Sequence, residues 1–183
     1  RKLCLLKLLL KYGGLLTPCN FLCNTDLKQL FDDSNKDCIV AENINEGYDF
    51  KEYFIPDSNF IGCKSSNNNV INEFIHFLET IISTDYTDTS NFLDIENKWC
   101  LDQANNNKLN VICGSKIITK TTDGNPVFLD DLFQNTLINY DKNAYGLLIP
   151  HDKIQKHNHY NWFLKLSIDE IKHITIVLPK KSK

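Results

Sequence analysis

The cysteines and histidines of this sequence could bind a metal ion. Three residues separate Cys19 from Cys23, and His157 and His159 alternate as residues on one side of an extended chain do. A structural zinc site needs four ligands, and no second cysteine pair or suitably spaced carboxylate completes either set. The spacing therefore favours reduced thiols and solvated histidines, and we expect no metal cofactor from these residues.

Acidic and aromatic side chains could act on a substrate. Asp130 and Asp131 fit the solvent face of a helix and Asp123 lies in a turn. No spacing singles out one acid, so no general base is assigned. Trp99 and Trp162 could stack on a sugar ring, but Trp99 falls on the apolar face of a helix and is expected in the core. The acids considered as bases are Asp94, Glu96, Asp102, Asp123, Asp130 and Asp131.

The residues Tyr12, Gly13 and Gly14 end a leucine-rich segment, RKLCLLKLLLKY, which is apolar around most of a helical circumference. A core helix is expected there, with its lysines on one polar stripe. Glycine after a helix is a common C-cap because it adopts left-handed backbone angles. Paired glycines also let a ligand approach the backbone closely. The residues alone leave both interpretations open.

A leucine-rich helix that ends in Tyr-Gly-Gly and leads into an apolar strand resembles the glycosyltransferases with a DXD sugar-binding region. In that family an Asp-x-Asp motif follows, and its carboxylates hold Mn²⁺ or Mg²⁺ against the diphosphate of a nucleotide-sugar. The cation neutralises the charge that develops as the nucleoside diphosphate leaves. The resemblance implies a GT-A-like fold in which Tyr12, Gly13 and Gly14 line the donor site.

The sequence departs from this family at the metal ligands. The two aspartates of the motif fall on Pro18 and Asn20. Asn20 offers a neutral carbonyl oxygen and is predicted to line the donor site, whereas Pro18 offers no side-chain ligand. Hard cations are held largely by charge, so Mn²⁺ or Mg²⁺ binding is disfavoured. The family's arginine before the motif is replaced by Leu5, with Arg1 one helical turn earlier.

The resemblance continues more weakly along the chain. The segment Ser58-Asn59-Phe60-Ile61-Gly62-Cys63, which leads into a helix, is similar to an Asn-x-Phe-Ile segment of the family. Cys113-Gly114-Ser115 is a loose counterpart of a later turn, and the stretch from His157 to Trp162 resembles a histidine-rich tail. The same run is similar to proteins of giant DNA viruses that carry this degenerate region, which would make the chain a virion component.

Helical and extended patterns alternate along the chain, which predicts an α/β domain with a mostly parallel sheet flanked by helices, its N-terminal part missing. Helices are expected at residues 1–12, 26–31, 70–82, 91–104 and 127–138. Strands are expected at residues 15–23, 38–41, 59–63, 111–114, 116–119, 146–150 and 174–178.

Length and charge narrow the class of protein. The 183 residues suit one glycosyltransferase-like domain over 1–183, and the absence of methionine indicates an excerpt of a longer chain. A net charge of −3 with mixed signs does not fit a nucleic-acid partner. No apolar run reaches the ~20 residues of a membrane span. The lack of Asn-x-Ser/Thr acceptors favours a cytoplasmic location, or a virion if the protein is viral.

Two functions follow from these features. The first is a glycosyltransferase that moves a hexose from a nucleotide-sugar to a glycan or protein, with a metal-independent donor site at Tyr12, Gly13, Gly14 and Asn20. The second is a pseudoenzyme that keeps the fold as a structural or binding component, with viral structural proteins as partners. The cysteines Cys4, Cys63, Cys100 and Cys113 lie among apolar neighbours and are expected to be buried in either case.

Overall fold

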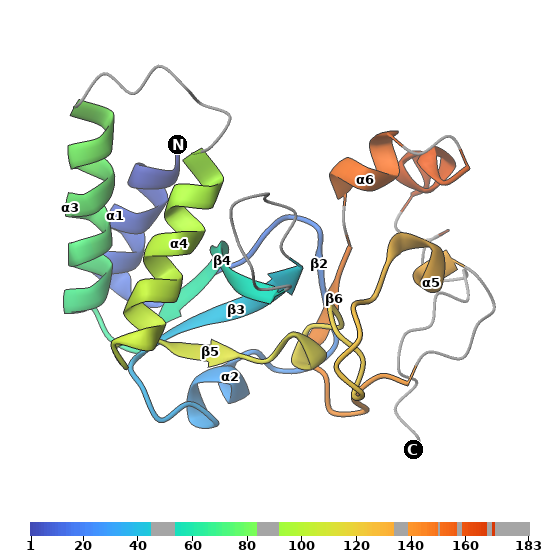
Figure 1. The fold of residues 1–183 in the computed structure, drawn as a ribbon, viewed down its shortest axis with the longest axis horizontal. Coiled ribbons are helices and arrows are strands. Elements are labelled where there is room, and N and C mark those ends of the chain that lie inside the picture. The colour runs from blue at the N-terminus through green and yellow to red at the C-terminus, as the bar shows by residue number, and fades with distance from the viewer. Residues whose placement is uncertain are drawn as a thin grey trace. The chain divides into compact units, whose positions relative to one another are not determined.

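The computed structural model describes residues 1–44, 54–83, 92–133, 139–149, 151–156, 159–167 and 170. The chain forms two compact units (Figure 1), the first from Arg1–Pro18 and Asp26–Gly114, the second from Cys19–Thr25 and the described residues after Gly114. Each unit has its own hydrophobic core. The expectation of a single domain over 1–183 stays a prediction.

The first unit contains a four-stranded sheet in the order β1-β4-β3-β5. Strand β4 pairs antiparallel with both β1 and β3, and β5 alone runs parallel to its neighbour β3. The α/β class is therefore confirmed, but the expected mostly parallel sheet is wrong. The physical reason is that only residues 45–53 separate β3 from β4, fewer than the dozen or more residues that the crossover of a parallel pair needs. The strands are β1 (Gly14–Leu16), β3 (Cys38–Ile44), β4 (Phe54–Cys63) and β5 (Asn110–Ile112).

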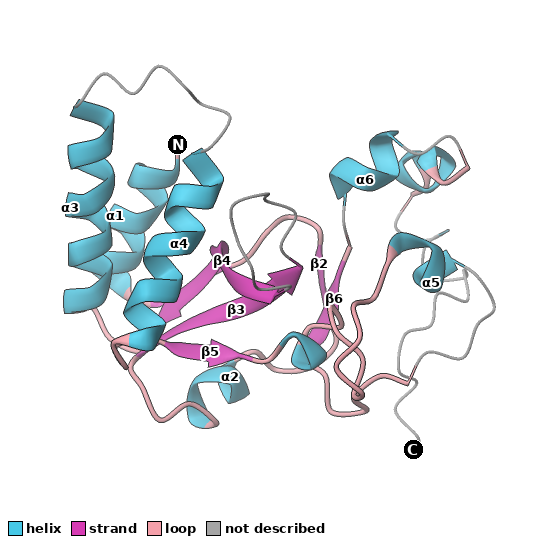
Figure 2. Cartoon of the chain, viewed as in Figure 1, coloured by secondary structure: helices cyan, strands magenta, loops and turns pink. Residues whose placement is uncertain are grey.

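Helices cover this sheet, as Figure 2 shows by colour. Helices α1, α3 and α4 pack on the face that carries Val40 and Ile61, and their shared core includes Leu6, Phe74 and Cys100. The short helix α2 covers the opposite face, where a Cβ atom on Gly62 would lie 2.9 Å from the Phe31 ring. The helices are α1 (Lys2–Tyr12), α2 (Lys28–Asp32), α3 (Asn69–Ser83) and α4 (Phe92–Asn105).

Strand β4 carries an irregularity that matters for the polar groups described below. Val40 pairs with Ile61 but the next residue, Ala41, pairs with Asp57, so the register skips three residues of β4. Two of the skipped or flanking backbone N–H groups bond to side chains, since Ser58 donates to the Asn97 Oδ1 at 2.9 Å and Asn59 to the Asp57 Oδ1 at 2.9 Å. The backbone N–H groups of Ser58 and Asn59 are therefore hydrogen-bonded although they have no partner on β3.

The second unit is built on the antiparallel pair β2 (Phe21–Cys23) and β6 (Gly146–Leu148). Its core includes Ile118, Leu132, Leu147, Ile154 and Phe163, all buried. Helix α5 (Leu129–Phe133), helix α6 (His151–Lys156) and the 3₁₀ helices η2 (Gly114–Lys116) and η3 (Asn161–Lys165) complete the described elements. Among the helices of the described ranges, none combines the length and apolar composition needed to span a bilayer.

Most helices predicted from periodicity are confirmed, whereas several strand predictions are not. Residues 15–23 form two short strands in different sheets instead of one segment, and residues 116–119 form no strand because η2 and a turn occupy them. The turn at residues 121–126 is present, with Thr121 and Asn125 bonded to each other. The predicted strand at 174–178 and the end of the helix at 127–138 lie outside the described residues.

Gly146 is required by close packing between β2 and β6. A Cβ atom there would lie 2.3 Å from the backbone oxygen of Leu22 and 2.5 Å from the Phe21 ring. We expect Gly146→Ala to lower the unfolding free energy of the second unit by about 3 kcal/mol, because the backbone oxygen cannot move aside. Gly124→Ala is the control, since its Cβ would meet open space and only the positive φ costs ~1 kcal/mol. Urea denaturation followed by Trp162 fluorescence measures both, and equal losses would contradict the packing argument.

Candidate functional site

The turn Tyr12-Gly13-Gly14 ends helix α1 as a C-cap. The Gly13 N–H donates to the Leu9 carbonyl at 2.8 Å, and Gly13 has a φ of 69°. Gly14 has a φ of 104° and open space where a Cβ atom would stand. The Tyr12 side chain is 68% exposed. The turn is therefore both a helix terminus and a stretch of backbone that another molecule can approach from the Gly14 side.

This turn lies against the segment that follows β4. A Cβ atom on Gly13 would lie 3.2 Å from the backbone carbon of Ser65 and 3.3 Å from the Lys64 carbonyl oxygen. The Asn67 N–H also donates to the Leu10 carbonyl at 2.6 Å. Any side chain at position 13 would push this segment away, so glycine is required here by close approach as well as by φ.

A polar pocket of about 360 Å³ opens beside the same segment. The start of β3, the N-terminus of α3 and the residue Lys108 before β5 contribute to it. Carboxylate, amide, hydroxyl and ammonium groups outnumber apolar ones in its wall. The lining residues are Asp37, Cys38, Ser65, Asn67, Asn68, Asn69, Val70 and Lys108.

The charges in this pocket are largely balanced. Lys108 bonds to the Glu73 carboxylate at 2.7 Å, and the other charged group of the wall is the exposed carboxylate of Asp37. Asn68 caps α3, since its Oδ1 accepts the N–H groups of Val70 and Ile71 at 3.0 and 3.2 Å. A pocket without surplus positive charge suits neutral hydroxyl groups better than a diphosphate.

Asn20 does not join Tyr12, Gly13 and Gly14 in one unit. Its side-chain amide donates to the Ile149 carbonyl, and its own carbonyl accepts the Ile149 N–H at 2.9 Å, so it extends the pairing of β2 with β6. Pro18 is the last residue of the segment Arg1–Pro18 of the first unit, and the chain passes to the second unit at Cys19. The prediction that Asn20 lines the donor site stays a prediction. In the described ranges, no three His, Cys, Asp or Glu residues are grouped to hold a metal ion.

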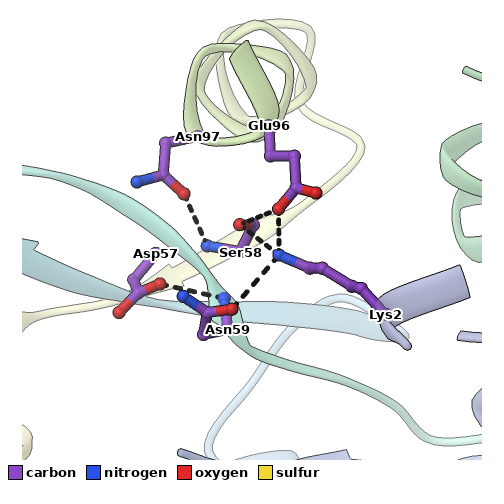
Figure 3. Close-up of polar contacts among 6 residues, drawn as sticks. All are labelled: Lys2, Asp57, Ser58, Asn59, Glu96 and Asn97. Carbon is purple, nitrogen blue, oxygen red and sulfur yellow. Dashed lines mark hydrogen bonds and ion pairs between the residues drawn. The ribbon is translucent and has the colours of Figure 1, made fainter. Parts of the chain in front are cut away.

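Glu96, one of the acidic candidates, belongs to a buried polar cluster at the β4 bulge (Figure 3). Lys2 donates to the Glu96 carboxylate, to the Ser58 Oγ at 2.6 Å and to the Asn59 Oδ1 at 3.3 Å. The Ser58 hydroxyl donates to the same carboxylate at 3.0 Å. Because Ser58 has no exposed surface and Glu96 is 2% exposed, neither meets a substrate in this arrangement. The cluster therefore joins α1, β4 and α4 structurally.

The other acidic candidates have local partners or lie on helices. Asp123 accepts from the Asn139 amide at 3.0 Å, Asp130 from the Tyr160 hydroxyl at 2.7 Å, and Asp131 from the Phe128 N–H at 2.8 Å. Asp94 and Asp102 lie on α4. None of these six acids lines the pocket, whereas Asp37, which the sequence did not single out, does. Residues Asn67 to Asn69 were also missed, since a run of one residue type has no chemical spacing to mark it.

The remaining candidates fall into core and surface groups. Trp99 stacks on Phe74 with ring centroids 4.4 Å apart, as the apolar face of its helix predicts. Cys19 and Cys23 are exposed and form no disulfide, and His157 lies outside the described residues. Cys63 and Cys100 are buried as expected, but Cys4 and Cys113 are exposed. Those two predictions were wrong because apolar sequence neighbours do not reveal which side of an element faces solvent.

Burial changes the acidity of three thiols in the first unit. Burial raises the pKa of Cys63 to about 11 and that of Cys100 to about 12. Burial also raises the pKa of Cys38 well above its ordinary value, and the neighbouring Cys63 and Cys100 raise it further. These thiols stay protonated and unreactive near neutral pH.

Comparison of the chain with protein-family models, with curated proteins and with solved structures finds no match in any of the three. The resemblance to the DXD glycosyltransferases therefore stays a prediction that rests on Tyr12-Gly13-Gly14 and its setting.

Proposed function

We propose that this chain is a glycosyltransferase-like protein that binds the sugar of a nucleotide-sugar and has lost metal-dependent transfer. The observation that carries the proposal is the position of Tyr12-Gly13-Gly14 against the segment that lines the polar pocket. The family resemblance assigns these three residues to a donor site, and a GT-A-like origin of the first unit is part of the same proposal. The pocket volume of about 360 Å³ falls in the range of small-molecule sites.

The chemistry of the pocket supports a sugar over a phosphate group. Asp37, Ser65 and Asn69 present acceptors and donors of the kind that bond pyranose hydroxyls. Lys108 is occupied by Glu73. The exposed ring of Tyr12 lies one residue from the glycines and offers a face for stacking. Binding therefore depends on hydrogen bonds from the pocket to the neutral hydroxyl groups of the sugar.

The same features argue against transfer. The leaving nucleoside diphosphate needs a cation or fixed positive charge. At the two positions where the resembled family has metal-binding aspartates, this sequence has Pro18 and Asn20. The pocket wall adds only Lys108, which is already paired. We accordingly place the protein with the pseudoenzymes, acting through binding as a cytoplasmic or virion component, with no acceptor to glycosylate.

A thermal-shift titration tests this function. UDP-, GDP- and CDP-sugars are added to the protein with EDTA or with Mn²⁺. A ligand at about ten times its Kd stabilises the folded state by about 1.4 kcal/mol. We expect one sugar nucleotide to raise the Tm equally with EDTA and with Mn²⁺, and its free sugar to do the same at higher concentration. A shift that requires Mn²⁺, or release of free nucleoside diphosphate on incubation with an acceptor glycan, would contradict the proposal.

Two matched variants locate the binding. Asp37→Ala removes the exposed carboxylate of the pocket, and Asp32→Ala removes an exposed carboxylate of α2 outside the pocket. We expect Asp37→Ala to weaken sugar binding roughly tenfold, since one charge-assisted hydrogen bond contributes about 1.5 kcal/mol. Asp32→Ala should leave the affinity unchanged. Equal affinities in the two variants would exclude this pocket as the site.

A further inference from the structure

Helix α1 exposes an apolar stripe that its role in the core does not explain. Leu6 and Leu9 point into the first unit and are buried, whereas Leu5, Leu8 and Tyr12 are 39%, 53% and 68% exposed. Their spacing of three and four residues places the exposed three along one side of the helix. The sequence predicts a core helix whose polar stripe is formed by lysines, whereas in the structure Leu5, Leu8 and Tyr12 are exposed.

Basic side chains accompany this stripe. Arg1, Lys7 and Lys11 are exposed on α1 or at its start, and α1 has no acidic residue. Lys7 bonds to Glu79 of α3 at 2.7 Å, while Lys2 turns inward to Glu96. In the part of the chain that the structure describes, Arg1 and Lys11 have no carboxylate partner. The Lys11 ammonium lies 4.9 Å from the centre of the Tyr12 ring, so charge and aromatic surface are adjacent.

We infer that this face of α1, formed by Arg1, Leu5, Leu8, Lys11 and Tyr12, binds an anionic membrane surface. A helix with leucines on one side and bordering cations lies in the interfacial plane, with its apolar residues among the acyl chains and its lysines at the headgroups. Tyrosine is favoured at that depth because its ring is apolar and its hydroxyl is polar. Each cation near the surface adds attraction to negative lipids.

The charge pattern favours an anionic lipid surface. The charged side chains of α1 are all cations, and a basic amphipathic helix is typical of an element that binds a membrane surface. A second copy of the chain would bring the same cations against one another, which disfavours self-association through this face. The binding is peripheral, and this face shares Tyr12 with the donor site proposed above but none of the residues that line the pocket.

Flotation with lipid vesicles tests this inference. The protein is mixed with vesicles of phosphatidylcholine alone or of phosphatidylcholine with phosphatidylserine, at low and at high salt. We expect binding to the phosphatidylserine vesicles that decreases as salt is added, and little binding to phosphatidylcholine alone. Equal binding to both compositions, or binding to neither, would overturn the inference.

Variants with matched controls identify the face. Leu8→Glu should lower partitioning at least tenfold, because it replaces an inserted leucine by a charge. Phe128→Glu makes the same kind of change at a 45% exposed residue of the second unit. It should change partitioning only through the added negative charge of the whole protein. Lys11→Glu should lower partitioning roughly fivefold or more, compared with Lys98→Glu on the exposed side of α4.

A second copy of the chain is the alternative occupant of this face, and its binding would give a different result in sedimentation. Sedimentation equilibrium without vesicles is expected to give a monomer for both the parent chain and Leu8→Glu. A dimer that Leu8→Glu converts to a monomer would show that a second copy covers this face and would overturn the inference. Unchanged vesicle binding by Leu8→Glu would overturn it as well.

Discussion

Replacing Lys2 by alanine is expected to lower the unfolding free energy of the first unit by about 3 kcal/mol. The Glu96 carboxylate is 3% exposed, and the Lys2 ammonium is the cation that bonds to it. Removing the lysine leaves a buried charge with only the Ser58 hydroxyl as a described hydrogen-bond donor. The Lys2 side chain is 22% exposed, which places the expected loss at the lower end of the range for buried pairs.

The fluorescence of Trp99 reports the unfolding of the first unit, in which the loss of stability is expected. Trp99 stacks on Phe74 in the first core, and the chain has two tryptophans, so a Trp162→Phe background leaves Trp99 as the reporter. Urea denaturation of Lys2→Ala in that background gives the free energy of unfolding. Lys7→Ala is the matched control, because it breaks the exposed pair with Glu79 on the same helix and should change stability little.

A double variant separates charge from packing. Lys2→Met with Glu96→Leu removes both charges and keeps the volume, so most of the loss should be recovered. If Lys2→Ala behaves like Lys7→Ala, the pair is solvated in solution and the buried cluster does not exist as described.

The first unit is expected to lose stability progressively above about pH 9. Cys38, Cys63 and Cys100 have raised pKa values in the folded state, so the unfolded state releases these protons first. Below about pH 9 both states hold the protons and the stability is fully present. Above pH 9 each thiol lowers the unfolding free energy by about 1.4 kcal/mol per pH unit, and the three together lower it by about 4 kcal/mol per pH unit. This loss continues to about pH 11 for Cys63 and about pH 12 for Cys100.

The measurement is the urea midpoint of Trp99 fluorescence at a series of pH values, with a reductant present. Removing one buried thiol as Cys63→Ala should reduce the pH slope by about a third, whatever the variant costs at neutral pH. Cys4→Ala removes an exposed thiol and should leave the slope unchanged. A midpoint that stays constant to pH 11 would contradict the burial of these thiols.

The candidate site shows how a linear motif and a folded site differ. Gly14 and Asn20 are six positions apart, yet the chain passes from one compact unit to the other between them. Residues far apart in the sequence, Asp37, Asn69 and Lys108, meet in one pocket instead. The motif residues Tyr12, Gly13 and Gly14 do not line this pocket, although Gly13 lies against Ser65, which does, so long-range packing defines the pocket.

The sequence by itself determined the helices and the end of α1. Helical periodicity is local, since residues three and four apart share a face, so α1, α3 and α4 were predicted within a few residues. The Tyr12-Gly13-Gly14 turn was predictable for the same reason, because a glycine stop depends on backbone angles at one point. That Pro18 and Asn20 stand where the resembled family has its two aspartates is also an inference from the sequence alone, and it stays a prediction.

Only the tertiary structure decided the strand pairing, the bulge and the exposed sides. Strand direction depends on which distant segments meet, so β3 and β4 pair antiparallel although a parallel sheet was predicted. Likewise Lys2 is partly buried beside Glu96, with 22% of its side chain exposed, while Leu8 faces solvent, the reverse of their hydrophobicities. The physical reason is that burial is set by the elements that pack on a helix, and at Lys2 these are the bulge of β4 and Glu96 of α4.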